Sequence, residues 1–145
     1  MPSPAEDDGP TAALSDLHYL AIPAQADRLP ALRRALARWA ASVGMVADRV
    51  QELTLASYEA MANVVAHAYR GLPRGVWELH ATYRATDRQI VVTVTDHGRW
   101  QPVLVNLDRL RAGGRGLPLI RAFAEDSTIN SDAGGTRVRM RWHTT

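Results

Sequence analysis

The stretch that decides the fold of this chain is residues 58–69, with the sequence YEAMANVVAHAY. Apolar residues recur through it at helical spacing, and the polar residues Glu59, Asn63 and His67 stand four positions apart. This spacing predicts that the three side chains share one face of a helix. A carboxylate and a carboxamide one turn apart can share a hydrated divalent cation with a phosphate, because cations of the magnesium type prefer oxygen ligands. The same spacing, taken alone, also fits a solvated stripe on an ordinary amphipathic helix.

Length and composition favour one soluble globular domain. The chain has 145 residues, 46% of them hydrophobic and 22% charged, and no apolar run is long enough to span a bilayer. It contains no cysteine, which excludes disulfides and thiolate chemistry, and its first residues do not resemble a signal peptide. A formal charge of +2 with scattered basic residues does not favour a nucleic-acid partner. We therefore expect a cytoplasmic protein that binds neither nucleic acid nor membrane directly.

The first half of the chain predicts a leader, a strand and two helices. Residues 1–16 are rich in Pro, Ala, Ser and acidic residues without hydrophobic periodicity, which predicts a flexible leader before a single domain over residues 17–145. A short strand is expected over residues 17–22, and an amphipathic helix over residues 26–43, before Gly44. The second helix is expected to start with Asp48 near its N-cap and to run to about Tyr69.

The second half changes to the period of strands. Two strands, 76–83 and 89–95, are expected to form a hairpin, followed by an irregular segment and a helix over residues 117–124. A second hairpin is expected from residues 127–131 and 136–142. Helices early and antiparallel strands late predict an α+β fold, a two-layer sandwich with the helices on one face of a mixed, largely antiparallel sheet.

Two glycine-bearing turns could hold backbone close to a ligand. Asp96-His97-Gly98 follows a predicted strand, so it places an acidic acceptor at the edge of the sheet, and Gly98 would let the chain turn away beneath a base. Residues 113–117, GGRGL, open a predicted helix, whose exposed amides and dipole favour phosphate oxygens. Each turn alone equally fits a loop that contains glycine for structural reasons.

In this order the motifs resemble the Bergerat-type ATP-binding fold of the gyrase, Hsp90, histidine kinase and MutL superfamily. The resemblance covers residues 17–142 and is greatest to the anti-sigma factor serine/threonine kinases. Residues 59–67 look like the N-box of that family, 96–98 like its first glycine box and 113–120 like its second. Gly134-Gly135-Thr136 is similar to its last nucleotide-side element. Trp100 stands where the family usually carries a second glycine in the first box.

The resemblance implies a role for each matching residue. Asn63 would bind the magnesium ion that bridges the ATP phosphates, and Glu59 would be the general base. Asp96 would accept the adenine amino group, while His67 would have a structural role. Gly98 would let the base approach closely, and Thr136 would support the adenine pocket. The phosphates would be bound at Gly114, Arg115, Gly116 and Leu117. Arg115 would also stabilise the charge that develops during transfer.

The resemblance also implies an activity and partners. The chain would be an ATP- and Mg2+-dependent kinase that phosphorylates a serine or threonine of an anti-anti-sigma (STAS-type) protein and sequesters a sigma factor. Pairing within the family also implies a homodimer. A second hypothesis stays open: a catalytically weak or inactive nucleotide-gated module that regulates transcription by partner occupancy alone. Retention of Glu59 and Asn63 favours the kinase. Trp100 favours the second hypothesis, because such a departure is expected in a pocket that is losing its ability to bind the nucleotide base.

Overall fold

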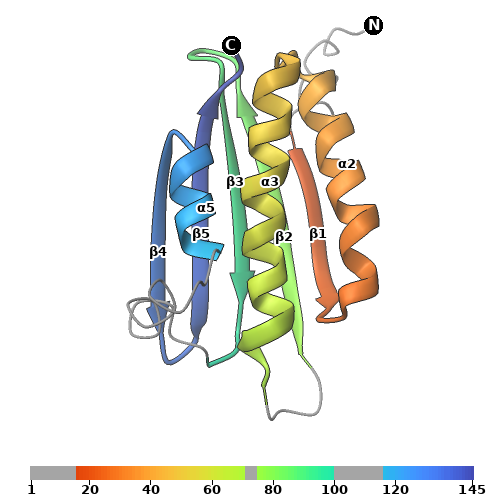
Figure 1. Cartoon of the computed structure of the whole chain (residues 1–145), viewed down its shortest axis with the longest axis vertical. Helices are drawn as coiled ribbons and strands as arrows, with labels where there is room; N and C mark the ends of the chain where they lie inside the picture. The colour runs from red at the N-terminus through yellow and green to blue at the C-terminus, as the bar shows by residue number, and fades with distance from the viewer. Residues whose placement is uncertain (1–15, 71–74, 100–115) are drawn as a thin grey trace, which may run out of the picture.

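The computed structural model describes residues 16–70, 75–99 and 116–145 (Figure 1). Several sequence predictions fall outside these residues: the leader except for Asp16, and the positions Trp100, Gly114 and Arg115. Gly116 and Leu117 are described only as the first residues of a helix. None of the helices in the described ranges is long and apolar enough to cross a membrane.

The described elements follow the predicted order of strand, helices, hairpin, helix and hairpin. Their bounds are β1 Asp16–Pro23, the 3-10 turn η1 Ala26–Arg28, α2 Leu29–Ser42, α3 Ala47–Asn63, the π turn η2 Val64–Ala68, β2 Val76–Arg84, β3 Gln89–Asp96, α5 Gly116–Phe123, β4 Asp126–Asp132 and β5 Gly135–His143. Gly44 lies just beyond α2 with φ of 101°, as expected for a helix-stopping glycine.

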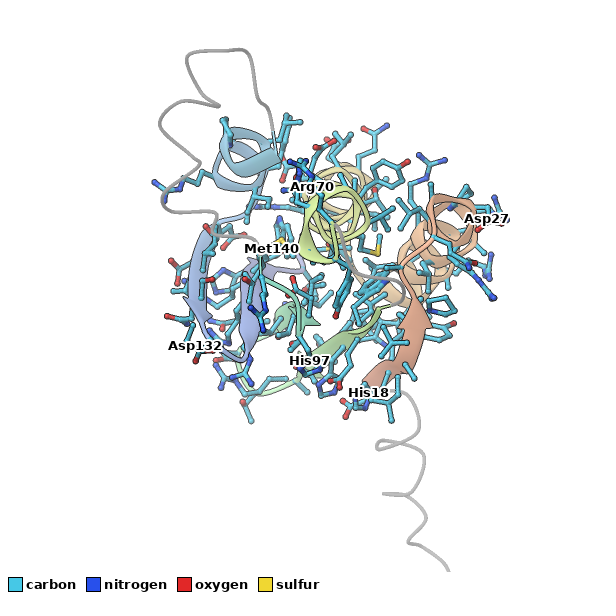
Figure 2. All side chains as sticks on the ribbon, turned by 90° about the horizontal axis from the view of Figure 1, so that it is seen from below. His18, Asp27, Arg70, His97, Asp132 and Met140 are labelled. Carbon is cyan, nitrogen blue, oxygen red and sulfur yellow. The ribbon has the colours of Figure 1, made fainter. Side chains whose placement is uncertain are left out.

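The five strands form one sheet in the order β1-β2-β3-β5-β4, and every neighbouring pair in it is antiparallel. Successive side chains of a strand point to opposite faces, and in β3 and β5 every second residue is buried. Figure 2 shows α2, α3 and α5 on one side of the sheet only. The predicted α+β two-layer sandwich is therefore confirmed.

The core lies between the helices and the sheet. Its largest fully buried side chains come from both layers: Leu36 from α2, Leu53 and Met61 from α3, and Trp77 and Trp142 from β2 and β5. Their burial removes large apolar areas from water, which is the main stabilising term in a domain of this size. The helix α3 packs against both α2 and α5, so it occupies the centre of the helical layer.

The structure corrects two details of the second predicted helix. Its N-cap is Val46, and Asp48 lies in the first turn, where a carboxylate still complements the positive end of the helix dipole. The α-helical part ends at Asn63, and the next five residues form the π turn η2. Turns of the π type are wider than α-helical turns and occur often at functional sites.

Candidate functional site

Glu59 and Asn63 lie one turn apart near the C-terminal end of α3. The buried residues Ala60 and Met61 hold this part of the helix against the core, while Glu59 and Asn63 are themselves half-buried. Among the described residues, neither side chain has a hydrogen bond or an ion pair. A carboxylate and an amide in this state remain available to a ligand or to water.

His67 lies beyond the α-helical segment that carries Glu59 and Asn63. It belongs to the π turn η2, where the backbone hydrogen bonds run from i to i+5. Its Nδ1 atom lies 2.8 Å from Nη2 of Arg70. Glu59 and Asn63 lie one turn apart on α3, and the place of His67 on the same face stays a prediction.

Asp96 is the last residue of β3 and is only 2% exposed. It pairs in register with Thr136 of β5, which is equally buried and lies on the same, helix-covered side of the sheet. The Asp96 carboxylate oxygen Oδ1 accepts a hydrogen bond of 2.9 Å from the amide of Gly98. The fold thus brings the predicted residues Asp96, Gly98 and Thr136 together.

Gly98 lies directly against the end of the π turn. A Cβ atom at this position would collide with the carbonyl oxygen of Ala68, and the amide of the next residue, Arg99, donates a 2.9 Å hydrogen bond to that same oxygen. Glycine is required here because two backbone segments approach each other closely. This contact is a structural reason for a glycine at position 98, in addition to the predicted close approach of a nucleotide base.

The turn between β4 and β5 is also built on close backbone contact. Gly135 has φ of 135°, and a Cβ atom on it would collide with the carbonyl oxygen of Asp96. The amide of Gly134 donates a 2.7 Å hydrogen bond to Oδ1 of Asp132. Together these contacts set the start of β5, and hence Thr136, beside the end of β3.

Tyr69 was not identified as a site residue from the sequence. Its hydroxyl donates a hydrogen bond to the carbonyl of Val76 and accepts one of 2.9 Å from the amide of His97. Burial raises the pKa of Tyr69, so the hydroxyl keeps its proton across the physiological range. An aromatic residue at the end of a helix, directly before a turn containing glycine and proline, was the available signal.

The second glycine box is described only in part. Gly116 and Leu117 form the first residues of α5, which packs against α3. Figure 1 shows α5 beginning toward the end of the sheet at which β3 ends. The N-terminal amides of this helix therefore lie toward the same end of the sheet as Asn63 and Asp96.

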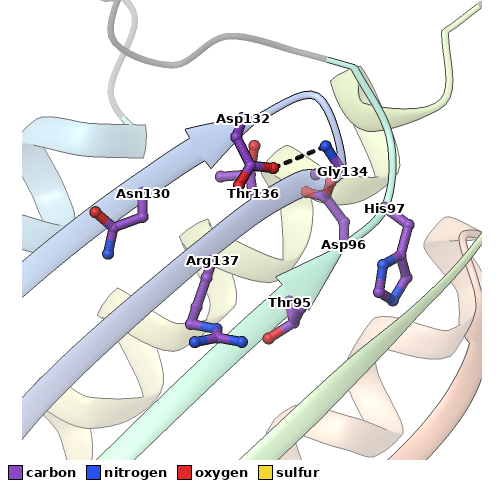
Figure 3. A pocket seen from close by; sticks show the side chains of 9 residues that line it. Thr95, Asp96, His97, Asn130, Asp132, Gly134, Thr136 and Arg137 are labelled. Atoms are coloured by element: carbon purple, nitrogen blue, oxygen red, sulfur yellow. Dashed lines mark hydrogen bonds between the residues drawn. The ribbon is translucent and has the colours of Figure 1, made fainter.

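A hollow of about 270 Å³ lies at the same end of the sheet but opens on the face away from the helices (Figure 3). Thr95, Asn130 and Arg137 line it from the positions that alternate with the buried residues of their strands. Asp96 and Thr136 also line it, whereas Glu59 and Asn63 do not line it. The hollow therefore shares Asp96 and Thr136 with the predicted site but does not include Glu59 or Asn63.

The donor set fits magnesium brought by a nucleotide better than a metal held by protein alone. Within the described ranges, no group of three or more His, Cys, Asp or Glu side chains could hold a metal ion. Mg2+ commonly keeps several waters and binds one or two protein oxygens together with substrate phosphates. The amide oxygen of Asn63 can supply one such ligand.

The chain is similar in sequence to known proteins. The chain is 29% identical over 143 residues to a serine-protein kinase RsbW of Listeria innocua, covering 90% of each chain. It is 25% identical over 118 residues to an anti-sigma F factor of Clostridium botulinum, covering 75% of this chain and 81% of that protein.

The fold also matches that of a solved structure. The crystal structure of the RsbU and RsbW domains of a Mycobacterium tuberculosis protein superposes with a TM-score of 0.70 at 22% identity, covering 88% of this chain and 32% of that longer chain. The sequence profile of the family described as histidine kinase-like ATPase domain matches residues 22–142. These findings confirm the resemblance inferred from the motifs. Because the profile spans most of the sequence, the chain belongs to the histidine kinase-like ATPase domain family.

Proposed function

We propose that this chain is an ATP-dependent protein kinase that phosphorylates a serine or threonine of a partner protein and acts as an anti-sigma factor. One observation carries the proposal. Glu59 and Asn63 lie half-buried near the end of α3, without a partner among the described residues, and the π turn that follows α3 holds the loop after Asp96 through Ala68. The residues proposed to act at the phosphates and at the base thus lie toward the same end of the fold.

The proposed roles follow from the chemistry of each side chain. Asn63 supplies an oxygen ligand to the magnesium ion that accompanies the ATP phosphates. The buried Asp96 carboxylate accepts the amino group of adenine, and Thr136 beside it supports the base. Glu59 accepts the proton of the partner hydroxyl as that oxygen attacks the terminal phosphate, which leaves ADP as the other product.

The phosphates themselves are assigned to the start of α5. Backbone amides in the first turn of a helix point at an anion placed there, and the helix dipole adds to the attraction. Gly116 and Leu117 occupy this turn. Gly114 and Arg115 are proposed to contribute from outside the described residues, with Arg115 opposing the charge that develops during transfer.

The partners are proposed from the relatives. Names of similar proteins include serine-protein kinase RsbW and anti-sigma F factor, which supports a sigma factor and an anti-anti-sigma protein as the binding partners. A STAS-type substrate, a homodimeric state and a cytoplasmic location are parts of the same proposal. A sigma factor acts on RNA polymerase, so that location follows from the function rather than from the fold.

The decisive experiment measures transfer of labelled γ-phosphate from ATP to an anti-anti-sigma protein. Glu59→Gln keeps the size of the side chain but cannot accept the proton, so we expect transfer to fall by about 10²–10⁴-fold while the affinity for ATP stays nearly unchanged. Glu52→Gln is the matched control, because Glu52 lies on the same helix two turns away in a surface ion pair with Arg49. We expect this control to transfer phosphate at the wild-type rate.

Two outcomes would contradict the kinase proposal in different ways. If Glu59→Gln transfers phosphate as fast as the wild type, Glu59 is not the base. If the wild type binds ATP and the partner but transfers no phosphate, the alternative of a nucleotide-gated binding module is correct. Retention of Glu59 and Asn63, with both side chains accessible, favours the kinase.

A further inference from the structure

Tyr69 connects three segments that are distant in the sequence. It follows the π turn η2 directly, and its half-buried ring packs on Gly75, where any Cβ atom would collide with that ring. Its hydroxyl donates to the carbonyl of Val76 at the start of β2 and accepts from the amide of His97 just after β3. The end of the helix is thereby tied to the entry of one strand and to the exit of another.

A second contact holds the same loop from its other side. The carbonyl oxygen of Ala68 accepts the amide of Arg99 at 2.9 Å, and Gly98 lies against Ala68 without room for a side chain. Consecutive residues at the helix end therefore bind the amides on either side of Gly98. The amide of Gly98 in turn donates to Oδ1 of Asp96, so this loop contributes to the orientation of the buried carboxylate.

We propose that Tyr69 is a positioning residue for base selection: through His97 and Gly98 it fixes the Asp96 carboxylate in the orientation that accepts the amino group of adenine. The inference rests on the proposed function, because it assigns a base-binding role to Asp96. Tyr69 acts on the nucleotide only through the loop and makes no contact with it. Loss of its hydroxyl releases the amide of His97 and lets the loop and the carboxylate move together.

Base selection provides a readout that a purely structural role would leave unchanged. Adenine presents an amino donor to the Asp96 carboxylate, whereas hypoxanthine presents a carbonyl oxygen at the same position, which a carboxylate repels. The ratio of the dissociation constants of ITP and ATP therefore reports how well the carboxylate is oriented. A variant that merely weakens the fold changes both constants in parallel and leaves their ratio unchanged.

The test compares Tyr69→Phe with the wild type. Phenylalanine keeps the ring on Gly75 and removes only the hydroxyl. Titration calorimetry with magnesium would give the dissociation constants for ATP and ITP, and NMR would give the hydrogen-exchange rate of the His97 amide without nucleotide. We expect Tyr69→Phe to bind ATP about 2- to 10-fold more weakly, with ITP nearly unchanged, and to exchange the His97 amide faster.

Tyr83→Phe is the matched control. Tyr83 is also half-buried against the core, but it lies near the far end of β2, paired with Ile90 at the end of the sheet opposite Asp96. We expect its variant to keep both the nucleotide ratio and the exchange rate of His97. The control thus separates the loss of a tyrosine hydroxyl in general from the loss of this one.

The unfavourable outcomes can be told apart. If the wild type prefers ATP and Tyr69→Phe prefers it equally, the inference is wrong and the proposed function stands. Equal losses of affinity for ATP and ITP would also overturn it, since they indicate a structural role only. If the wild type binds neither nucleotide at millimolar concentration, the proposed function fails, and the base-selecting role of Tyr69 fails with it.

Discussion

At the scale of single residues, two glycines of the site are explained by contacts between backbone segments. Gly98 and Gly135 both lie where a methyl group would collide with a carbonyl oxygen, of Ala68 in the first case and of Asp96 in the second. Both contacts bring the end of β3 to its neighbours. Glycine at these positions is therefore a requirement of the tertiary fold as well as of any ligand.

We predict that Gly98→Ala lowers the free energy of unfolding by about 1–3 kcal/mol or more, because the added methyl must push the loop away from the π turn. Gly134→Ala is the control, since its Cβ would find Asp132 Oδ1, at 3.3 Å, as its nearest neighbour. Urea denaturation of both variants measures the difference. Equal losses in the two variants would contradict the assigned contact.

The two polar residues of α3 are predicted to affect different steps. Asn63→Ala should weaken binding of ATP in the presence of magnesium and have little effect when the metal is chelated, because only the metal ligand is removed.

Glu59→Ala should bind ATP with nearly wild-type affinity and mainly lose transfer. Calorimetric titrations with and without EDTA distinguish the variants. A metal-independent loss in Asn63→Ala would exclude Asn63 as a ligand.

At the scale of elements, Glu125, which lies between α5 and β4, joins α3 and β5 at the end of the fold opposite Asp96. Its carboxylate lies 2.7 Å from Nη1 of Arg49 on α3 and 2.7 Å from Nδ1 of His143 on β5, and it accepts the His143 amide at 2.9 Å. Partial burial acts to raise the pKa of Glu125, but the hydrogen bonds from His143 and the charge of Arg49 outweigh it. The pKa of Glu125 therefore lies below its usual range.

This direction determines the expected pH dependence of stability. A carboxyl group whose pKa is lower in the folded state stabilises the fold above its unfolded pKa, about 4.3, and this contribution is lost as the pH falls through the folded value. Glu125→Gln should cost about 0.5–1 kcal/mol at pH 7, a small effect because the group is partly exposed, and almost nothing at pH 3. Urea denaturation at both pH values measures it.

The control for the pH prediction is Asp27→Asn. Asp27 is exposed in η1, and in the described part of the chain it has no ion pair. Its variant should differ little from the wild type at either pH. If Glu125→Gln shows the same loss of stability at pH 3 as at pH 7, its ion pairs do not account for that loss.

At the scale of the whole molecule, binding and stability are linked. The proposed site joins α3, the end of β3 and the start of β5, which belong to both layers of one cooperative core. A ligand that binds only the folded state adds its binding free energy to the free energy of unfolding. Stability therefore reports nucleotide binding without any assumption about catalysis.

We predict that ATP with magnesium, at about one hundred times its dissociation constant, stabilises the fold by roughly 2.7 kcal/mol. For a domain of this length, that corresponds to an increase in Tm on the order of 2–6 °C in a thermal denaturation scan. Chelation of magnesium should reduce the increase. The absence of any shift at millimolar nucleotide would contradict both the kinase and the nucleotide-gated module.

Local patterns predicted the elements well because each pattern arises within a few neighbouring residues. The alternation in residues 89–95 and the leucine spacing in 26–43 correspond to β3 and α2. The chain continues as a helix after Asn63, so the position of the second helix was correct, but its change to a π turn was not predicted. Nothing in the residues themselves distinguishes a π turn from an α-helix at this point.

The sequence by itself determined the order of the elements, the two-layer architecture and the candidate residues Glu59, Asn63, Asp96 and Thr136. Only the tertiary structure revealed that the helix changes to a π turn after Asn63, that Gly98 lies against Ala68, and that Tyr69 holds the loop after β3. The physical reason is the separation along the sequence of the residues that interact. Periodicity and turn chemistry act between near neighbours, whereas the bond from His97 to Tyr69 joins residues 28 positions apart and exists only once the helical layer has packed on the sheet.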